Sequence, residues 1–248
     1  VQRSAGLFTR KQEMEELRIR AAKLQKECLA AQEKTDQCKE QVDALQAELT
    51  ATASEQITAA NDRVRAEAEQ KRLEKWGAQR FTVAFIDGVH ENYDLLERYP
   101  LEDWHGGQAR HITGDLWHLP RGEIYEIEGK RYFCMGGGEE PEREMRRAAN
   151  TFWEREMPTE QEMQQAVARL AAADNRVDIM LTHEPSAKAG GQLIARTREL
   201  NGVHLFLSML EDTVSFSHWY FGALHLDRDV SRNHTAVFRR VLPVPSDR

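Results

Sequence analysis

The stretch from Thr9 to Trp76 contains neither glycine nor proline, and this limits what the chain can form more than any other feature. Ala, Glu, Gln, Lys and Arg dominate it, and all of them have high helix propensity. Glycine returns at Gly77, where a helix C-terminus is expected. The sequence therefore predicts a flexible start at residues 1–8, followed by one helix over residues 9–76. At about 1.5 Å per residue that helix would be roughly 100 Å long.

Apolar and small residues recur along this helix at alternating spacings of three and four. That spacing places them at positions a and d of a heptad repeat and predicts a left-handed coiled coil. Successive spacings of four around Ala53 form a stutter, where the supercoil should unwind locally. The predicted seam consists of Met14, Leu17, Ala21, Leu24, Cys28, Ala31, Thr35, Cys38, Val42, Leu45 and Leu49, continuing as Ala53, Ile57, Ala60, Val64 and Ala68.

A single helix of this length can bury such a seam only against another helix. Because no Gly or Pro turn would let the helix fold back on itself, we expect self-association as a parallel dimer. Cys28 and Cys38 fall on the seam and would face their symmetry mates. We interpret them as small core fillers, with redox cross-linking as the alternative.

Charge and composition exclude several functional classes. The chain has 248 residues and a net charge of −7, which argues against nucleic acid or an anionic membrane surface as the main partner. It contains no run of about 18 apolar residues that could span a membrane, and its start lacks the apolar core of a signal peptide. A first residue other than Met would also fit a processed chain. Three widely spaced cysteines indicate a reducing compartment, so we expect a cytoplasmic protein without a disulfide framework.

Residues 77–248 are predicted to form a separate globular domain, in which strand and helix patterns alternate. This alternation predicts an α/β or α+β layered domain. Three helices are expected. One begins near Tyr93, one follows the capping box Thr159–Glu162, and one covers about Leu193–Leu200. The expected strands are Phe81–Ile86 (buried), Ile124–Ile127, Arg131–Met135, Val177–Thr182, His218–Phe221 and Thr235–Val241, with the second and third forming a hairpin.

Three of these strands are each followed, within about four residues, by a histidine: His90, His183 and His225. The tips of strands in open α/β sheets are where ligands bind. Taken singly, each histidine is readily explained as a surface or hydrogen-bonded residue. Taken together, the three histidines suggest an alternative interpretation, in which they share one metal or phosphate site. His105, His111 and His118 have no such placement and are interpreted as structural.

Four motifs in the domain resemble the calcineurin-like metallophosphoesterase superfamily, in particular its small bacterial members. Those proteins carry Gly-Asn-His-Glu-Asn, a hairpin leading into a glycine pair, Thr-His-x-x-Pro, and Trp-x-Phe-Gly-His-x-His with a nearby Asp-Arg. The resemblance covers roughly residues 81 to 242. The corresponding segments here are Gly88-Val89-His90-Glu91-Asn92, Tyr132-Phe133-Cys134-Met135-Gly136-Gly137, Thr182-His183-Glu184-Pro185, and Trp219-Tyr220-Phe221-Gly222-Ala223-Leu224-His225 followed by Asp227-Arg228.

The resemblance implies metal ligands at His183 and His225, one for each of two divalent ions of the Mn or Fe/Zn type, and a phosphate-contacting acid at His90. The sequence departs from this pattern at two ligand positions, which are Val89 and Ala223. Neither side chain has a lone pair to donate. The two early Asp/His motifs of the family should precede Phe81, where the coiled coil lies instead. Gly114-Asp115 stands in the wrong order and is interpreted as a turn.

Without the strands that carry those early motifs, the Phe81 strand would present an unpaired apolar edge. We expect the other protomer, a swapped element or another polypeptide to cover it. The preferred hypothesis is a non-catalytic oligomeric scaffold or binding module with a decayed metallophosphoesterase-like domain and no cofactor. The alternative is a metal-dependent phosphoesterase with residual activity, or one whose missing ligands come from another chain. Nucleic-acid binding through the helix is a third hypothesis, and it lacks a basic stripe or an aromatic platform.

Overall fold

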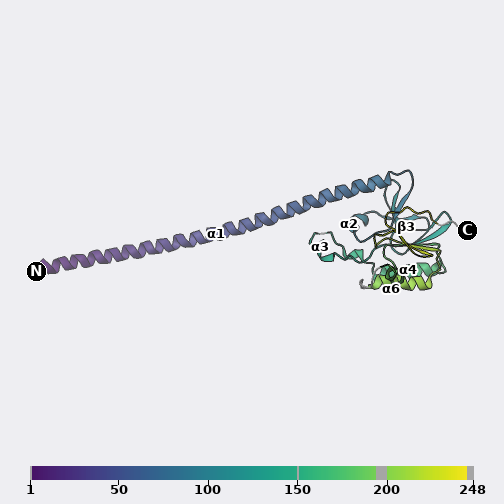
Figure 1. Cartoon of the computed structure of the whole chain (residues 1–248). Helices are drawn as coiled ribbons and strands as arrows, with labels where there is room; N and C mark the ends of the chain where they lie inside the picture. The colour runs from purple at the N-terminus through teal and green to yellow at the C-terminus, as the bar shows by residue number, and fades with distance from the viewer. Residues whose placement is uncertain (1, 150, 194–199, 245–248) are drawn as a thin grey trace. The chain divides into compact units, whose positions relative to one another are not determined.

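The computed structural model describes residues 2–149, 151–193 and 200–244, with side chains from Lys11 onward. The chain divides into two units, of which the first ends at Glu69 and the second begins at Gln70. The first unit is helical, and the second contains both sheets (Figure 1). The prediction of a mixed α/β protein with a long N-terminal helix is thereby confirmed.

Helix α1 spans Gln2–Gly77 without a break. It begins ahead of the expected Thr9, so the segment predicted as a flexible start is already helical from Gln2. In the single chain, the large apolar residues of the predicted seam are 51–71% exposed. Cys28 and Cys38 are exposed free thiols. Among the described residues, every helix is too short or too polar to cross a membrane.

The last two turns of α1 belong to the second unit. Leu73 packs against a cluster of Leu96, Ile112 and Leu116. The carbonyl of Gly77 accepts a 3.0 Å hydrogen bond from the backbone N–H of Asp115. The boundary between the units therefore lies several residues before the glycine that ends the helix, because the end of α1 packs on the second unit.

Within the described residues, one sheet has four strands in the order β1-β4-β3-β2. β1 pairs in parallel with β4, and the other neighbours are antiparallel. The expected strand Phe81–Ile86 is shorter and less buried than predicted, since Phe81 is 63% exposed and Ala84 is also exposed. β1 lies at an edge of the sheet, as expected. The strands are β1 (Val83–Phe85), β2 (Leu101–Trp104), β3 (Gly107–Thr113) and β4 (Leu116–His118).

A second sheet has six strands in the order β5-β6-β7-β8-β10-β9 within the described residues. The predicted hairpin is confirmed as β5 and β6, which pair from Glu123 with Cys134 to Ile127 with Lys130. β6, β7 and β8 are mutually parallel, so their C-terminal ends meet at one edge. The strands are β5 (Glu123–Ile127), β6 (Lys130–Met135), β7 (Ile179–Thr182), β8 (His218–Phe221), β9 (Arg228–Ser231) and β10 (His234–Ala236).

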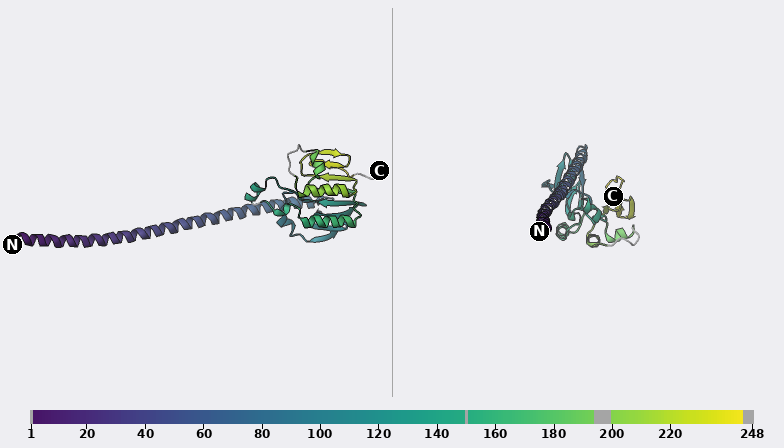
Figure 2. Two further views of the ribbon diagram at one scale, coloured as in Figure 1. Left: turned by 90° about the horizontal axis from the view of Figure 1, so that it is seen from below. Right: turned by 90° about the vertical axis from the view of Figure 1, so that its left-hand side faces the viewer.

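The two sheets are stacked between helices. Helices α4 and α6 cover one face of the six-stranded sheet (Figures 1 and 2), where Leu170 and Leu207 pack with Trp219. The opposite face meets the four-stranded sheet, and Tyr125 on β5 donates a 2.7 Å hydrogen bond to the carbonyl of Gln108 on β3. The helical segments are α2 (Tyr93–Leu96), α3 (Arg143–Ala148), the 3₁₀ turn η1 (Glu154–Glu156), α4 (Glu160–Ala172), α5 (Ala187–Gly191) and α6 (Gly202–Thr213).

Several element predictions need correction. The closing strand expected over Thr235–Val241 is limited to β10, because the chain leaves the sheet after Ala236. The helix expected over Leu193–Leu200 falls mostly on residues 194–199, which lie outside the described part. The capping box at Thr159 is confirmed, since its hydroxyl accepts from the backbone N–H of Glu162. Gly114 and Asp115 form the turn between β3 and β4, as predicted.

Candidate functional site

The strand-end histidines predicted from the sequence line one cavity, which we call the histidine pocket. His90 follows β1, His183 follows β7 and His225 follows β8, so three strand ends supply them. The cavity has a volume of about 660 Å³, in the range of small-molecule sites. It is lined by Ile86, Gly88, Val89, His90, Glu91, Glu139, Pro141, His183, Glu184, Ala223 and His225.

Backbone hydrogen bonds hold these strand ends together. The N–H of His183 donates to the carbonyl of Met135 at the end of β6, at 3.0 Å. The carbonyl of His183 accepts from the N–H groups of Gly222 and Ala223, at 3.1 and 2.9 Å. Because β6, β7 and β8 are parallel and in register, these bonds extend the ladder past the strands and fix the backbone around the pocket.

His183 is half-buried, whereas His90 and His225 are exposed. Its ring packs against Gly88, where an added Cβ would come within 3.3 Å of His183 Cε1. Burial lowers the pKa of His183; Glu184 and Asp87 oppose this shift, and His225 and His90 reinforce it. The imidazole is consequently neutral at pH 7 and offers a lone pair to a ligand.

The other two histidines are more exposed. The side chain of His90 is 52% exposed, and its Nδ1 lies 2.8 Å from Glu140 Oε2. Glu140 is buried and also lies 3.2 Å from Nε of Arg146. His225 has a positive φ of 51° and packs its ring 5.0 Å from that of Phe238. His90 is thus held toward an acidic partner on the segment after β6.

The donors around the pocket do not fit a two-metal centre. Val89 and Ala223 line it at positions where the resemblance expects ligands, and neither can donate an electron pair. Among the described residues, no group of three or more His, Cys, Asp and Glu side chains is arranged to hold a metal ion. Glu184 points to a different partner, since its Oε2 lies 3.2 Å from Nε2 of the buried His204. No metal-dependent step can be derived from this set.

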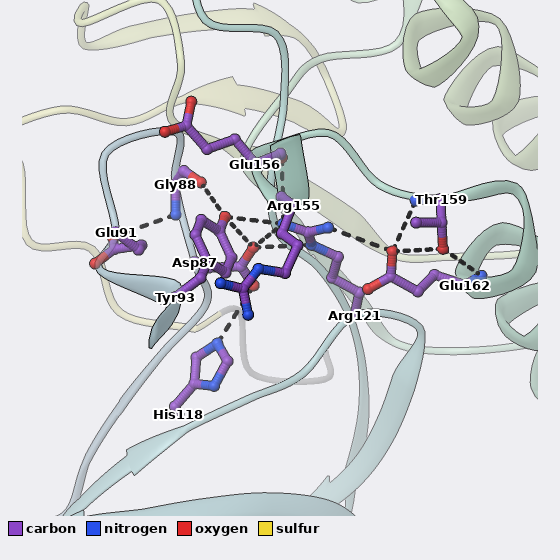
Figure 3. A network of polar contacts seen from close by, with 10 residues as sticks. All are labelled: Asp87, Gly88, Glu91, Tyr93, His118, Arg121, Arg155, Glu156, Thr159 and Glu162. Carbon is purple, nitrogen blue, oxygen red and sulfur yellow. Dashed lines mark hydrogen bonds and ion pairs between the residues drawn. The ribbon is translucent and has the colours of Figure 1, made fainter. Parts of the chain in front are cut away.

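A buried polar network adjoins the histidine pocket through Asp87, which directly precedes Gly88 (Figure 3). Asp87 Oδ2 accepts hydrogen bonds from Arg121 Nη2 and Nε, at 2.6 and 2.8 Å, and from the hydroxyl of Tyr93 at 2.9 Å. Its Oδ1 lies 3.3 Å from Nε2 of His118. Asp87, Arg121 and His118 are each no more than 8% exposed. The network joins the end of β1 and helix α2 to the connection between the two sheets.

The charges in this network stabilise one another. Burial alone would raise the pKa of Asp87, but hydrogen bonding by His118 and the charge of Arg121 lower it well below its usual range. Burial would lower the pKa of Arg121, and the adjacent Asp87 raises it instead. Burial and the Asp87 carboxylate both raise the pKa of Tyr93. All three groups therefore keep their ordinary neutral-pH charge states despite their burial.

Comparison with known proteins gave no relative. A scan of protein-family models, a search of curated proteins and a search of solved structures each found no match.

Three consecutive glycines let buried carboxylates approach the end of β6. A Cβ on Gly136 would come within 2.3 Å of Asp87 Oδ1, and a Cβ on Gly138 within 2.6 Å of Glu184 Oε1. Gly137 has a φ of +74°, in the region that favours glycine. The sequence predicted Gly136–Gly138 only as a strand terminator, and their second role is to make room for Asp87 and Glu184.

The sequence analysis missed most of the Asp87 network. Asp87 stands in the strand-end motif and could have been found as a polar residue next to the predicted strand. His118 was interpreted as structural, and it is a buried partner of Asp87. Arg121 carries no local signal, because its partners lie 34 residues earlier in the chain and in the segment around Arg155. Only the three-dimensional fold brings these groups together.

Proposed function

We propose that the chain is a non-catalytic oligomeric binding module, in which α1 forms a parallel coiled-coil dimer and the α/β unit is a decayed relative of the calcineurin-like metallophosphoesterases. The observation that carries the proposal is the lining of the histidine pocket. His90, His183 and His225 share it with Val89 and Ala223, which are apolar at two expected ligand positions. The stacking of two sheets between helices is the arrangement that the resemblance implies, and it supports the relationship.

The alternative is a metal-dependent phosphoesterase whose missing ligands come from another chain. The neutral imidazole of His183 favours it, because a lone pair is what a divalent transition metal requires. Three glutamates line the same pocket, but among the described residues no group of three or more donors is arranged to hold an ion. A two-metal centre also needs a bridging carboxylate to offset its charge. The donor set therefore supports the non-catalytic module better.

Metal content and turnover distinguish the two proposals. The purified full chain is analysed for bound metal and assayed with an aryl phosphodiester in the presence of Mn²⁺. We expect less than one equivalent of metal and no hydrolysis that depends on His183. The matched control is His218, which lies on β8 and does not line the pocket. Stoichiometric metal, with turnover lost in His183→Ala and retained in His218→Ala, would overturn the non-catalytic proposal.

The dimer is supported by the exposed seam of α1. Leu24 and Leu45 lie on the seam and are 58% and 64% exposed in the single chain. Ile19 and Leu29 are equally exposed at 64% and 58%, but they lie outside the heptad positions a and d. The two pairs therefore give a test in which side-chain hydrophobicity and exposure are matched and only the heptad position differs.

We expect light scattering to report a dimer for the wild-type chain. Leu24→Glu with Leu45→Glu should shift it to monomer, because two charges per chain would enter a packed seam. Ile19→Glu with Leu29→Glu should leave the dimer intact. A wild-type monomer, or equal effects of the two double variants, would contradict a coiled coil built on this seam.

A further inference from the structure

A second cavity lies beside the Asp87 network, and we call it the Arg110 pocket. Its volume is about 290 Å³, at the small end for ligand sites. Buried Asp87, Tyr93 and Arg121 form its floor, while exposed Glu97 and Thr159 lie at its rim. The cavity thus connects solvent to a buried polar interior, and its size suits a molecule of a few carbon atoms.

The charges around this cavity are unevenly matched. Arg121 pairs with Asp87 and lies 3.4 Å from Glu162. Arg155 pairs with Asp94 and Glu97. Arg110 instead donates to the carbonyl of Tyr99, a neutral acceptor, and within the described residues it forms no ion pair with a carboxylate. Its remaining guanidinium N–H groups are available to an anion that enters the cavity.

His118 supplies a second unmatched group next to Arg110. The two residues are directly opposite each other on β4 and β3, so their side chains lie on the same face of the sheet. His118 Nε2 lies 3.3 Å from the Asp87 carboxylate and so carries the proton in the neutral ring. Its Nδ1 is buried and has no hydrogen-bond partner in the described part of the chain.

The Arg110 guanidinium and His118 Nδ1 would bind two different kinds of atom in one ligand. Arg110 requires a negative group, and the geometry of its fork matches a carboxylate. The lone pair of His118 Nδ1 requires a hydrogen-bond donor, which a hydroxyl group provides.

We propose that the Arg110 pocket binds a small hydroxycarboxylate, with the carboxylate on Arg110 and the hydroxyl group donating to His118 Nδ1. This site is distinct from the histidine pocket and does not depend on the function proposed for it. The two sites are adjacent, because Asp87 lines one and Gly88 lines the other.

The test uses lactate as the probe and propionate, which lacks only the hydroxyl group, as its matched analogue. Calorimetry and thermal unfolding of the full chain are recorded up to about 20 mM ligand, which covers Kd values near 1 mM. We expect saturable lactate binding and a rise in Tm, with propionate at least about threefold weaker. Absence of saturable binding, or equal binding of both acids, would overturn the proposal.

Variants assign the two contacts. Arg110→Gln should weaken lactate binding at least tenfold, and His118→Gln should abolish the preference for lactate over propionate. The control is Arg98→Gln, which removes the same charge from an exposed arginine that does not line the cavity and should leave binding unchanged. Equal loss in Arg98→Gln and Arg110→Gln would reduce the effect to net charge and contradict the site.

Imidazole ¹⁵N NMR of the wild-type chain tests the hydrogen bond without any substitution. Lactate should shift the Nδ1 resonance of His118 and propionate should not. An Nδ1 signal that responds to neither acid, or to both equally, would place the hydroxyl group elsewhere and refute the proposed contact.

Discussion

Asp87 places a charged carboxylate at an almost fully buried position of the domain. An isolated buried charge costs several kcal/mol, and pairing with good hydrogen-bond geometry offsets that cost. Here Arg121 gives two hydrogen bonds to one oxygen and Tyr93 gives a third. The residues of this network are therefore coupled, and removing one member leaves the others buried without a partner.

At this scale we predict that Asp87→Asn lowers the free energy of unfolding by about 3–5 kcal/mol, because Arg121 stays buried without its counter-charge. Arg121→Met should cost a similar amount for the converse reason. The loss in the double variant should be smaller than the sum of the two single losses by more than about 1 kcal/mol. Urea unfolding at 25 °C measures all three. Additive losses would show that the pair is not a coupled unit.

At the scale of elements, the sequence predicted those whose signals are local. The β5–β6 hairpin, the capping box of α4 and strands β7 and β8 were all predicted, because turn residues, caps and β-branched runs are short-range features. Strand β2 was missed because three of its four residues are exposed, and strand β3 because two of its buried positions hold very small residues. These are Gly107 and Ala109, and a Cβ on Gly107 would come within 2.8 Å of the Ile124 carbonyl oxygen on the second sheet.

The residues of the candidate site likewise fall into those that local sequence signals predicted and those that they did not. The histidines at strand ends were predicted because parallel strands bring their C-terminal ends to one edge, whatever the loops do. Arg121 and the buried pair of Glu184 and His204 were not predicted, since each depends on contacts between distant segments. The apolar Val89 and Ala223 were identified only through the resemblance.

A second prediction concerns the contact between the end of α1 and the turn before β4. Gly114 has a φ of +57°, and a Cβ there would come within 2.1 Å of the Gly77 carbonyl oxygen. Gly106 has a φ of +87° and nothing within 4 Å of an added Cβ. Gly106→Ala should cost only backbone strain, about 1 kcal/mol. Gly114→Ala should cost clearly more, and thermal unfolding compares the two. Equal losses would mean that the turn can move away from the helix.

For the whole molecule, buried histidines set the dependence of stability on pH. Burial lowers the pKa of His183, His218 and His234. The unfolded chain, with histidine pKa values near 6.5, therefore binds protons before the native state does. Protonation of these histidines therefore costs no stability above about pH 7. The loss of stability grows as the pH falls through about 6.5 toward the lower pKa values of the native state. Asp87, with its lowered pKa, adds a further loss below about pH 4.

We predict that the urea midpoint is constant between about pH 7 and 8 and decreases from about pH 6.5 to 5. His183→Gln combined with His234→Gln should flatten this decrease, whereas replacement of the exposed His105 by Gln should not. The measurement is a series of urea titrations with the slope m checked for constancy. A midpoint that rises on acidification would show that protonation of these rings favours the native state.

The position of the unit boundary has a practical consequence for anyone who shortens this chain. A polypeptide that starts at Ala78 would lose Leu73 and the Gly77 carbonyl, leaving Leu96, Ile112 and Leu116 open to water and the Asp115 N–H unpaired. One that starts at Gln70 keeps both contacts. The last two turns of α1 cover apolar side chains of the second unit. A fragment that begins after Gly77 would therefore be less stable and more prone to aggregate.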